Sequence, residues 1–264
     1  FFGTGDTLIG AETLLSLRRR DPIQTTKEGV KIYEKPIKGH QYIMTVDVAK
    51  GRGQDYSTFN LLDVTANPFK QVAVYRNNTI SPLLYPNIIY KFAESYNQAM
   101  VVIESNDSGQ VVCNGLYHEL EYENMFVEST VKANSLGLLM TRKVKRIGCS
   151  SFKDLLENQK IEIVDEDTIL EISTFVAKGQ SYEASQGNHD DLVMNFIMFS
   201  YFSGTIFFNE ITDINIKQLM FEERMQEIEN DVLPFGFIDD GLDQQPQYDP
   251  DRDGWAVEYS HENF

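Results

Sequence analysis

The chain has 264 residues, of which 42% are hydrophobic, and its formal net charge is −17. This length and apolar content allow one large domain, or one domain with appendages, with a sizeable core. Evenly spread, such a charge would argue against nucleic-acid binding. It is concentrated instead: residues 206–264 hold 15 acidic and 3 basic residues, which leaves 25 acidic and 20 basic residues for 1–205.

The cysteines and the first residues of the chain carry no specific signal of function. Cys113 and Cys149 form neither a disulfide framework nor a zinc-ligand spacing, so we expect a reducing, cytoplasmic setting. The first residues do not resemble a signal peptide. The longest apolar stretch, 192–208, contains polar residues and is short for a bilayer span, which favours a buried helix and no membrane contact. The chain starts without Met, so we expect it to be a piece of a longer protein.

The first half of the chain predicts an arm followed by a sheet. Residues 1–40 are polar and predict an N-terminal arm or interdomain segment, with one short helix near 10–19. Three strands and short connections then predict an antiparallel meander. A helix with apolar residues at helical spacing follows, and a short apolar run predicts a fourth strand, central and parallel to the first. These five elements span residues 41–48, 57–63 and 71–76 (strands), 82–96 (helix) and 100–104 (fourth strand).

The second half alternates helices and strands. Residues 130–147 look like a basic loop, and Ser150 precedes a helix. Lys178-Gly179 predicts the turn of a hairpin. The other predicted elements are helices at 109–122, 151–158, 167–173 and 190–202, strands at 125–128 and 160–164, and the two strands of a hairpin over 174–184.

Residues 206–264 predict an acidic C-terminal extension, partly disordered. Residues 214–230 have the pattern of an acidic amphipathic helix, and 239–254 are rich in Asp, Gly, Gln and Pro, which is typical of disorder. One hypothesis is that this extension mimics DNA and covers the basic loop, in which case truncation after residues 201–204 raises DNA affinity.

The order β-β-β-α-β-α-β-α over residues 41–205 is that of a ribonuclease H-like α/β domain, a mixed sheet flanked by helices. Three antiparallel strands come first and parallel strands follow. In this plan the first and fourth strands lie side by side, so Asp47 and Glu104 come close together. A late helix crossing behind the sheet brings Asp191 to the same edge.

Asp47, Glu104 and Asp191 are the candidate catalytic and metal-binding residues. Each stands at the end of an apolar strand or at the start of an apolar helix, where a carboxylate is costly unless a cation neutralises it. Mg²⁺ prefers oxygen ligands, and two metal ions can activate a water and stabilise the leaving oxygen of a displacement at phosphorus. The alternative for each acid alone is a strand-end or capping residue.

Three neighbouring residues are accessory candidates with open alternatives. Asp55 is either a further metal ligand or a turn residue that bonds its own backbone. Asp190 is either a ligand or the N-cap of the following helix. His189 either orients a water or bonds locally. Basic residues near this site are candidate contacts for DNA phosphates, with a solvated surface as the alternative; they are Arg52, Arg142, Lys143, Lys145 and Arg146.

Five motifs together resemble the nuclease half of tailed-phage large terminases, the DNA-packaging motors. The likeness runs from about 41 to 202. The motifs are Thr45-Val46-Asp47-Val48-Ala49-Lys50-Gly51-Arg52-Gly53-Gln54-Asp55-Tyr56, Tyr85-Pro86-Asn87-Ile88, Val102-Ile103-Glu104-Ser105-Asn106, Ile147-Gly148-Cys149-Ser150 and Gly187-Asn188-His189-Asp190-Asp191-Leu192-Val193-Met194.

The resemblance implies a ribonuclease H-like endonuclease that depends on Mg²⁺ or Mn²⁺, with two ions when substrate is bound, and that cuts concatemeric double-stranded viral DNA during packaging. Its catalytic acids match Asp47, Glu104 and Asp191. The implied partners are duplex DNA, an ATPase domain missing from this chain, the portal protein and the small terminase subunit. The implied location is the cytoplasm of the infected bacterial host and, transiently, the prohead portal. The alternatives are another ribonuclease H-like nuclease, such as a junction resolvase, and a non-catalytic module that docks DNA or portal.

Overall fold

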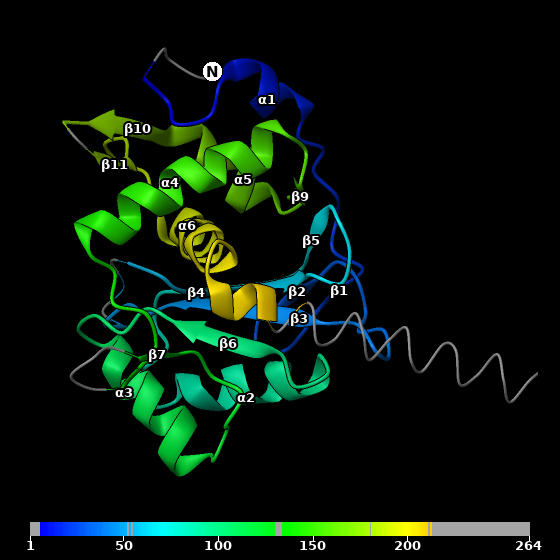
Figure 1. The fold of residues 1–264 in the computed structure, drawn as a ribbon, viewed down its shortest axis with the longest axis vertical. Coiled ribbons are helices and arrows are strands. Elements are labelled where there is room, and N and C mark those ends of the chain that lie inside the picture. The colour runs from blue at the N-terminus through cyan, green and yellow to red at the C-terminus, as the bar shows by residue number, and fades with distance from the viewer. Residues whose placement is uncertain are drawn as a thin grey trace, which may run out of the picture. The chain divides into compact units, whose positions relative to one another are not determined.

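Seven strands form one mixed sheet, in the order β1-β2-β5-β4-β3-β6, with β9 beside β5 (Figure 1). The computed structural model describes residues 6–51, 53, 55–129, 134–179, 181–210 and 212. All of them belong to the first of two units into which the chain divides, Phe1–Leu219 and Met220–Phe264. The helix predicted over 214–230 and the disorder predicted over 239–254 therefore lie outside the described residues, and the domain boundaries at 40 and 205 stay a prediction.

The sheet is antiparallel except at two places. β3 pairs antiparallel with β4 and parallel with β6, and β9 pairs parallel with β5. The ribonuclease H-like mixed sheet predicted from the sequence is therefore confirmed. Its strands are β1 (Gln24–Thr25), β2 (Lys31–Ile32), β3 (Tyr42–Asp47), β4 (Ser57–Asp63), β5 (Phe69–Asn77), β6 (Met100–Ile103) and β9 (Ile161–Glu162).

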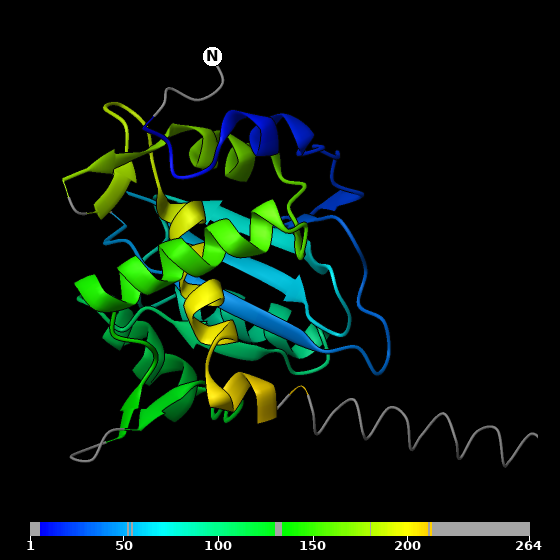
Figure 2. The same cartoon turned by 45° about the horizontal axis from the view of Figure 1, so that its top comes forward.

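Helices cover both faces of this sheet (Figure 2). On one face, α6 lies against β3 and β4, and α4 packs against α6. On the other face lie α2, α3 and a π-helical segment, η1. The helices are α1 (Ala11–Ser16), α2 (Tyr85–Ser95), α3 (Gly109–Asn114), η1 (Gly115–Glu119), α4 (Arg142–Glu157), α5 (Glu166–Thr174) and α6 (Asp191–Ser203).

Strand β3 contributes side chains to the hydrophobic cores on both faces of the sheet. Side chains alternate between the faces of a strand. Ile43 joins the cluster that contains Phe196 and Ile197 of α6, whereas Met44 and Val46 join the cluster beneath α2. Because both faces are covered, β3 is apolar at nearly every position, as is usual for a strand buried on both sides.

Helix α6 is buried nearly all round, from Leu192 to Ser200, which identifies it as a core helix. It and α4 approach closely at Gly148, where a Cβ atom would lie 2.5 Å from the carbonyl oxygen of Ile197. Only glycine permits this approach, so the Ile147-Gly148-Cys149-Ser150 motif has a packing role. Within the described residues, no helix combines the length and the apolar character that crossing a bilayer requires.

Three sequence predictions differ from the structure. β6 is the last strand of the sheet and not a central one; it is apolar because helices bury it. The strand predicted at 125–128 is divided: Met125 forms an isolated parallel bridge with Val101 of β6, whereas β7 (Val127–Ser129) pairs with β8 (Asn134–Leu136) in a hairpin. The helix predicted from 151 begins at Arg142, because the side chain of Thr141 accepts a hydrogen bond from the Val144 N–H and caps it.

Candidate active site

Asp47 and Glu104 stand at the same edge of the sheet on neighbouring strands. Asp47 is the last residue of β3, and Glu104 follows β6 directly. Val46 and Ile103 are partners in the parallel register, and the N–H of Glu104 donates to the carbonyl of Val46 at 2.9 Å. The register predicted from the sequence is therefore present, and it brings the two carboxylates to one place.

The turn after Glu104 has little freedom. A Cβ atom on Gly109 would lie 1.7 Å from the carbonyl oxygen of Glu104, so the first turn of α3 rests directly on this residue. Asn106 exchanges two hydrogen bonds with the backbone of Met140, at 2.9 and 3.1 Å. The segment that leads into α4 is thereby fixed alongside Glu104.

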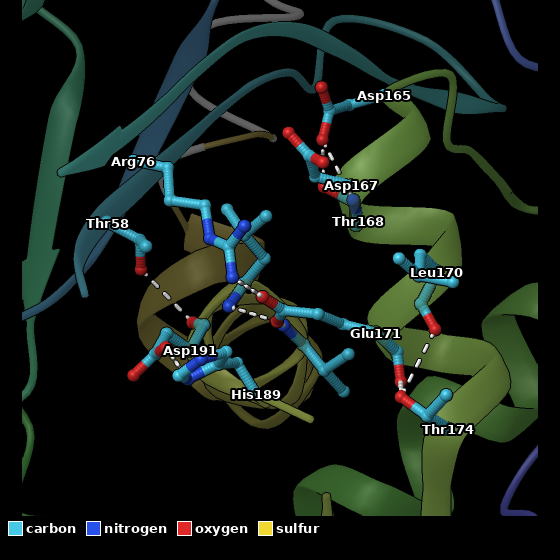
Figure 3. Close-up of polar contacts among 12 residues, drawn as sticks. Thr58, Arg76, Asp165, Asp167, Thr168, Leu170, Glu171, Thr174, His189 and Asp191 are labelled. Atoms are coloured by element: carbon cyan, nitrogen blue, oxygen red, sulfur yellow. Dashed lines mark hydrogen bonds and ion pairs between the residues drawn. The ribbon is translucent and has the colours of Figure 1, made fainter. Parts of the chain in front are cut away.

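Thr58 connects Asp47 to Asp191. In the β3–β4 register Thr58 is the partner of Asp47, and its hydroxyl donates to the carbonyl of Asp191 at 3.1 Å (Figure 3). The amide of Asn195 donates to the Thr58 hydroxyl at 2.7 Å. The first turn of α6 is thus attached to β4 beside the end of β3, and Asp191 reaches the edge that Asp47 occupies.

A pocket of about 400 Å³ opens at this edge. Two of the three candidate acids line it, together with Asp55; the complete lining is Asp47, Val48, Ala49, Lys50, Asp55, Asp107, Ser108 and Asp191. Asp47, Glu104 and Asp191 are each partly buried. The pocket is open to solvent and large enough to admit part of a phosphodiester backbone.

The carboxyl groups repel one another. Burial and the charges of Glu104 and Asp191 raise the pKa of Asp47 well above its ordinary value. Burial raises the pKa of Glu104 to about 7; the charge of Lys145 opposes this rise and that of Asp190 adds to it. Burial raises the pKa of Asp191 to about 6, against a lowering by a backbone hydrogen bond from Tyr56. Such mutual destabilisation of charged forms is typical of carboxylates that share a small site.

Asp190 has a different local role from the helix cap that the sequence favours. It precedes α6, but its side chain makes no capping hydrogen bond to the helix. Its Oδ2 accepts from the N–H of Ala184 at 3.3 Å instead, and its charge raises the pKa values of Asp47, Glu104 and Asp191. Asp190 therefore lies within electrostatic reach of all three candidate acids.

His189 and Asp55 also lie near Asp191. The Nδ1 atom of His189 is 3.6 Å from Asp191 Oδ2, and its ring meets the Tyr56 ring edge-on with 4.9 Å between centroids. Asp55 is exposed, and its charge raises the pKa of Asp191. Whether these residues or Asp190 bind a metal stays a prediction.

Within the loop predicted over 130–147, the basic residues Arg142, Lys143, Lys145 and Arg146 lie at the start of α4, and 134–136 form β8. Arg142, Lys143 and Arg146 are exposed, and Lys145 is half-buried close enough to Glu104 to lower the pKa of that acid. The basic turn therefore stands beside the acidic edge. Arg52 lies outside the described residues.

The oxygen atoms of these acids suit a hard cation whose remaining coordination positions are filled by substrate. Asp191 Oδ2 is buried and accepts no hydrogen bond, and among the described residues no lysine or arginine forms an ion pair with Asp47 or Glu104. A buried carboxylate oxygen that accepts no hydrogen bond is costly. No group of three or more Asp, Glu, His or Cys in the described part of the chain is spaced to hold an ion by itself. Mg²⁺ commonly binds one or two carboxylates plus substrate phosphate and water, which these residues can provide.

The comparisons with known proteins agree with this arrangement. The family model described as the terminase RNaseH-like domain matches residues 44–198, more than half of the chain. This chain belongs to that family. The match includes Asp47, Glu104 and Asp191, and the family is that of terminase nuclease domains, as the sequence motifs predict.

Solved structures of phage terminase nucleases have the same fold. The large terminase nuclease of thermophilic phage G20c with bound magnesium is 20% identical, with a TM-score of 0.61 over 75% of this chain and 98% of that one. The same nuclease with bound cobalt gives 20% identity and 0.60, with the same coverage. The nuclease domain from Thermus phage P74-26 gives 20% identity and 0.54 over 70% and 90%. At these identities the likeness shows the fold.

One residue of this region had no place in the sequence predictions. Glu171 of α5 is buried, and its Oε2 accepts from the N–H groups of Leu192 and Val193 at 2.7 and 3.3 Å. Its other oxygen lies 3.3 Å from a terminal nitrogen of Arg76 (Figure 3). The sequence carries no signal for this role, because the burial of Thr168, Glu171 and Ile172 on one face of α5 is seen only in the structure.

Proposed function

We propose that this domain is an Mg²⁺- or Mn²⁺-dependent endodeoxyribonuclease that cuts double-stranded DNA. The observation that carries the proposal is the meeting of Asp47, Glu104 and Asp191 at one sheet edge, with raised pKa values and few cationic partners. In this proposal the three acids contribute oxygen ligands to the metal, together with substrate phosphate and water, and Asp55 and Asp190 are further candidate donors. The cobalt- and magnesium-bound G20c nucleases support a divalent ion in this fold.

A bound divalent ion supplies Lewis-acid polarisation of the scissile phosphate and makes the attacking water more acidic. The chain's own residues supply the rest. The carboxylates fix the position of the cations, and the exposed arginines and lysine at the start of α4 bind phosphates on either side of the cut. Hydrolysis transfers a hydroxyl to phosphorus and releases the 3′ oxygen, so the products carry a 5′ phosphate and a 3′ hydroxyl.

Nicking of a supercoiled plasmid under Mg²⁺ titration tests this proposal. Asp47→Asn, Glu104→Gln and Asp191→Asn are expected to fold and to abolish nicking. The matched control is Asp63→Asn, because Asp63 is a buried acid at the opposite end of β4 that pairs with His40 at 2.7 Å; it is expected to cut like the wild type. Full cutting by Asp47→Asn would overturn the assignment. DNA ligase should reseal the nicks without prior end repair.

A competition between substrates addresses the alternatives. A junction resolvase prefers four-way junctions to linear duplex, whereas the proposed enzyme cuts both without preference. A non-catalytic docking module leaves plasmid intact at every Mg²⁺ or Mn²⁺ concentration.

The biological setting belongs to the same proposal. Concatemeric viral DNA is the proposed substrate, and the terminase ATPase domain, the portal protein and the small terminase subunit are the proposed partners. The domain then acts in the cytoplasm of the infected host and, transiently, at the prohead portal. Family membership supports a DNA substrate and an ATPase domain as partner.

A further inference from the structure

Asp191 is the only one of the three candidate acids that a helix presents, so its position depends on how the start of α6 is held. Asp191, Leu192 and Val193 are the first three residues of that helix. The N–H groups of a first turn have no partner within the helix and need an acceptor from outside. In most helices the preceding side chain provides it, but here Asp190 does not.

Glu171 provides the acceptor from another helix. Its Oε2 takes both the Leu192 and the Val193 N–H, at 2.7 and 3.3 Å, and the residue is 4% exposed. Burial raises the pKa of Glu171 to about 7, against a lowering by the charge of Arg76. In its charged form Glu171 also complements the helix dipole at this end of α6. The carboxylate thus fixes the two residues that follow Asp191 in the chain.

Arg76 holds Glu171 in turn and connects it to the other side of the site. Its guanidinium lies 3.3 Å from Glu171 Oε1 and 3.8 Å above the centre of the Tyr56 ring. The Tyr56 ring contacts the His189 ring, and a hydrogen bond from the Tyr56 backbone lowers the pKa of Asp191. The residues on both sides of Asp191 are therefore attached to one ion pair, in which Glu171 is buried and Arg76 is partly exposed.

We propose that Glu171, held by Arg76, is a positioning residue that sets the metal affinity of the site by capping the α6 turn that carries Asp191. This inference rests on the proposed function. Glu171 does not face the pocket, because its two oxygens face the α6 backbone and Arg76. It acts through the geometry of Asp191 and takes no part in DNA binding.

Two substitutions separate this role from a merely structural one. Glu171→Gln keeps the volume and one acceptor oxygen but loses the charge that faces Arg76, and Glu171→Ala removes both. Loss of a partner that orients a metal ligand typically weakens metal affinity or activity by about 10- to 100-fold. We expect the lower figure for Glu171→Gln and the higher for Glu171→Ala, in Mg²⁺ affinity by calorimetry and in kcat, with KM for DNA unchanged.

Asp165→Asn is the matched control. Asp165 is a fully buried carboxylate that caps a helix through the Thr168 N–H at 2.8 Å, but it caps α5 and not α6. The substitution is expected to lower the melting temperature and to leave Mg²⁺ affinity and kcat at wild-type values. Hydrogen exchange without metal supplies a direct readout: the Leu192 and Val193 amides exchange faster in Glu171→Ala and not in Asp165→Asn.

The results decide between the possibilities. Folded Glu171 variants that keep wild-type Mg²⁺ affinity and kcat would overturn the positioning role, and so would an equal loss in Asp165→Asn. If Glu171→Ala does not fold, the same comparison is made with Glu171→Gln. A wild type that binds Mg²⁺ and does not cut DNA contradicts the proposed function, while Mg²⁺ affinity and amide exchange still judge Glu171.

Discussion

The N–H of Glu104 donates to the carbonyl of Val46, the residue before Asp47. This one hydrogen bond between parallel strands sets the two acids side by side, and no movement of a loop separates them without breaking the sheet. A site built on strand ends is rigid, and the carboxylates keep their mutual repulsion even without a cation.

Asp47→Asn should stabilise the domain in the absence of metal while it abolishes cutting. Burial and the charges of Glu104 and Asp191 raise the pKa of Asp47, which means that its charged form destabilises the fold. A neutral side chain removes this repulsion. We expect a gain of about 1 kcal/mol, or about 2–4 °C in Tm for a chain of this size, measured by thermal unfolding in EDTA.

Asp165→Asn should have the opposite effect on stability. Burial alone would raise the pKa of Asp165, but hydrogen bonds from Lys31 and Tyr33 and the charge of Lys31 outweigh it and lower the pKa. The charged form therefore stabilises the fold. Because Lys31 is partly exposed, we expect a loss of about 2 kcal/mol and no more. Two buried acids that respond alike in EDTA would contradict this electrostatic account.

Stability without metal should fall as pH rises from about 4 to about 7. The folded-state pKa values of Glu104 and Asp191 are raised, to about 7 and about 6. Their contribution is therefore complete below the ordinary carboxyl pKa of about 4 and is lost as pH passes the raised values. Urea unfolding in EDTA should show a decrease of about 2 kcal/mol across this window.

Mg²⁺ should reverse that decrease at pH 8 and act weakly at pH 5, because protons compete for the same oxygens. Asp47→Asn serves as the control, with a shallower dependence on pH. A free energy of unfolding that rises steadily to pH 8 in EDTA would show that the charged forms of Glu104 and Asp191 do not destabilise the fold.

Alanine substitution of Arg142, Lys143 and Arg146 should weaken DNA binding equally for all sequences. These exposed residues stand on the first turn of α4. Each lost phosphate contact lowers the salt dependence of binding by about one unit in the log–log slope. Fluorescence anisotropy at several salt concentrations measures it. Lys153→Ala is the control, since Lys153 lies later on α4 and pairs with Glu157 at 3.7 Å.

Gly109→Ala should displace Glu104. The added Cβ atom would lie 1.7 Å from the Glu104 carbonyl oxygen, so the turn must move. We expect a loss of about 3 kcal/mol in stability, the upper range for overpacking, and a large loss of nicking. Gly10→Ala is the control, because a Cβ atom there meets nothing within 4 Å. Normal activity in Gly109→Ala would mean that the position of Glu104 is not critical.

Local patterns in the sequence predict much of this fold. The strand at 57–63 agrees residue for residue with β4, because turn residues bound it on both sides. The parallel pairing of β3 with β6 follows from two apolar runs that each end on an acid. Helix α4 was predicted to start too late because its basic first turn looks like a loop. The capping Thr141 and the buried spacing of Val144, Gly148 and Phe152 indicate the true start.

The rest required tertiary structure. Nothing near Glu171 in the sequence points to Leu192, since the contact joins residues 21 positions apart on two helices. Asp190 has the ordinary position of a helix cap, and only its bond to Ala184 shows that it does something else. β6 is the last strand of the sheet because its outer side forms only isolated bridges, between Val101 and Met125 and between Glu104 and Leu138. Periodicity does not predict this.

Helix α5 connects the amino-terminal segment to α6 through a buried acid near each of its ends. Asp165, at its start, holds Lys31 and Tyr33 of the amino-terminal segment, and Glu171, one turn and a half later, holds the start of α6. A shortened chain that begins after Tyr33 would remove both partners of Asp165. Asp165 lies at the opposite end of α5 from Glu171, which holds the turn of α6 that carries Asp191. Trimming the amino terminus to the first long strand would therefore lower the stability of the domain, and fragments made for biochemistry should keep residues 31–33.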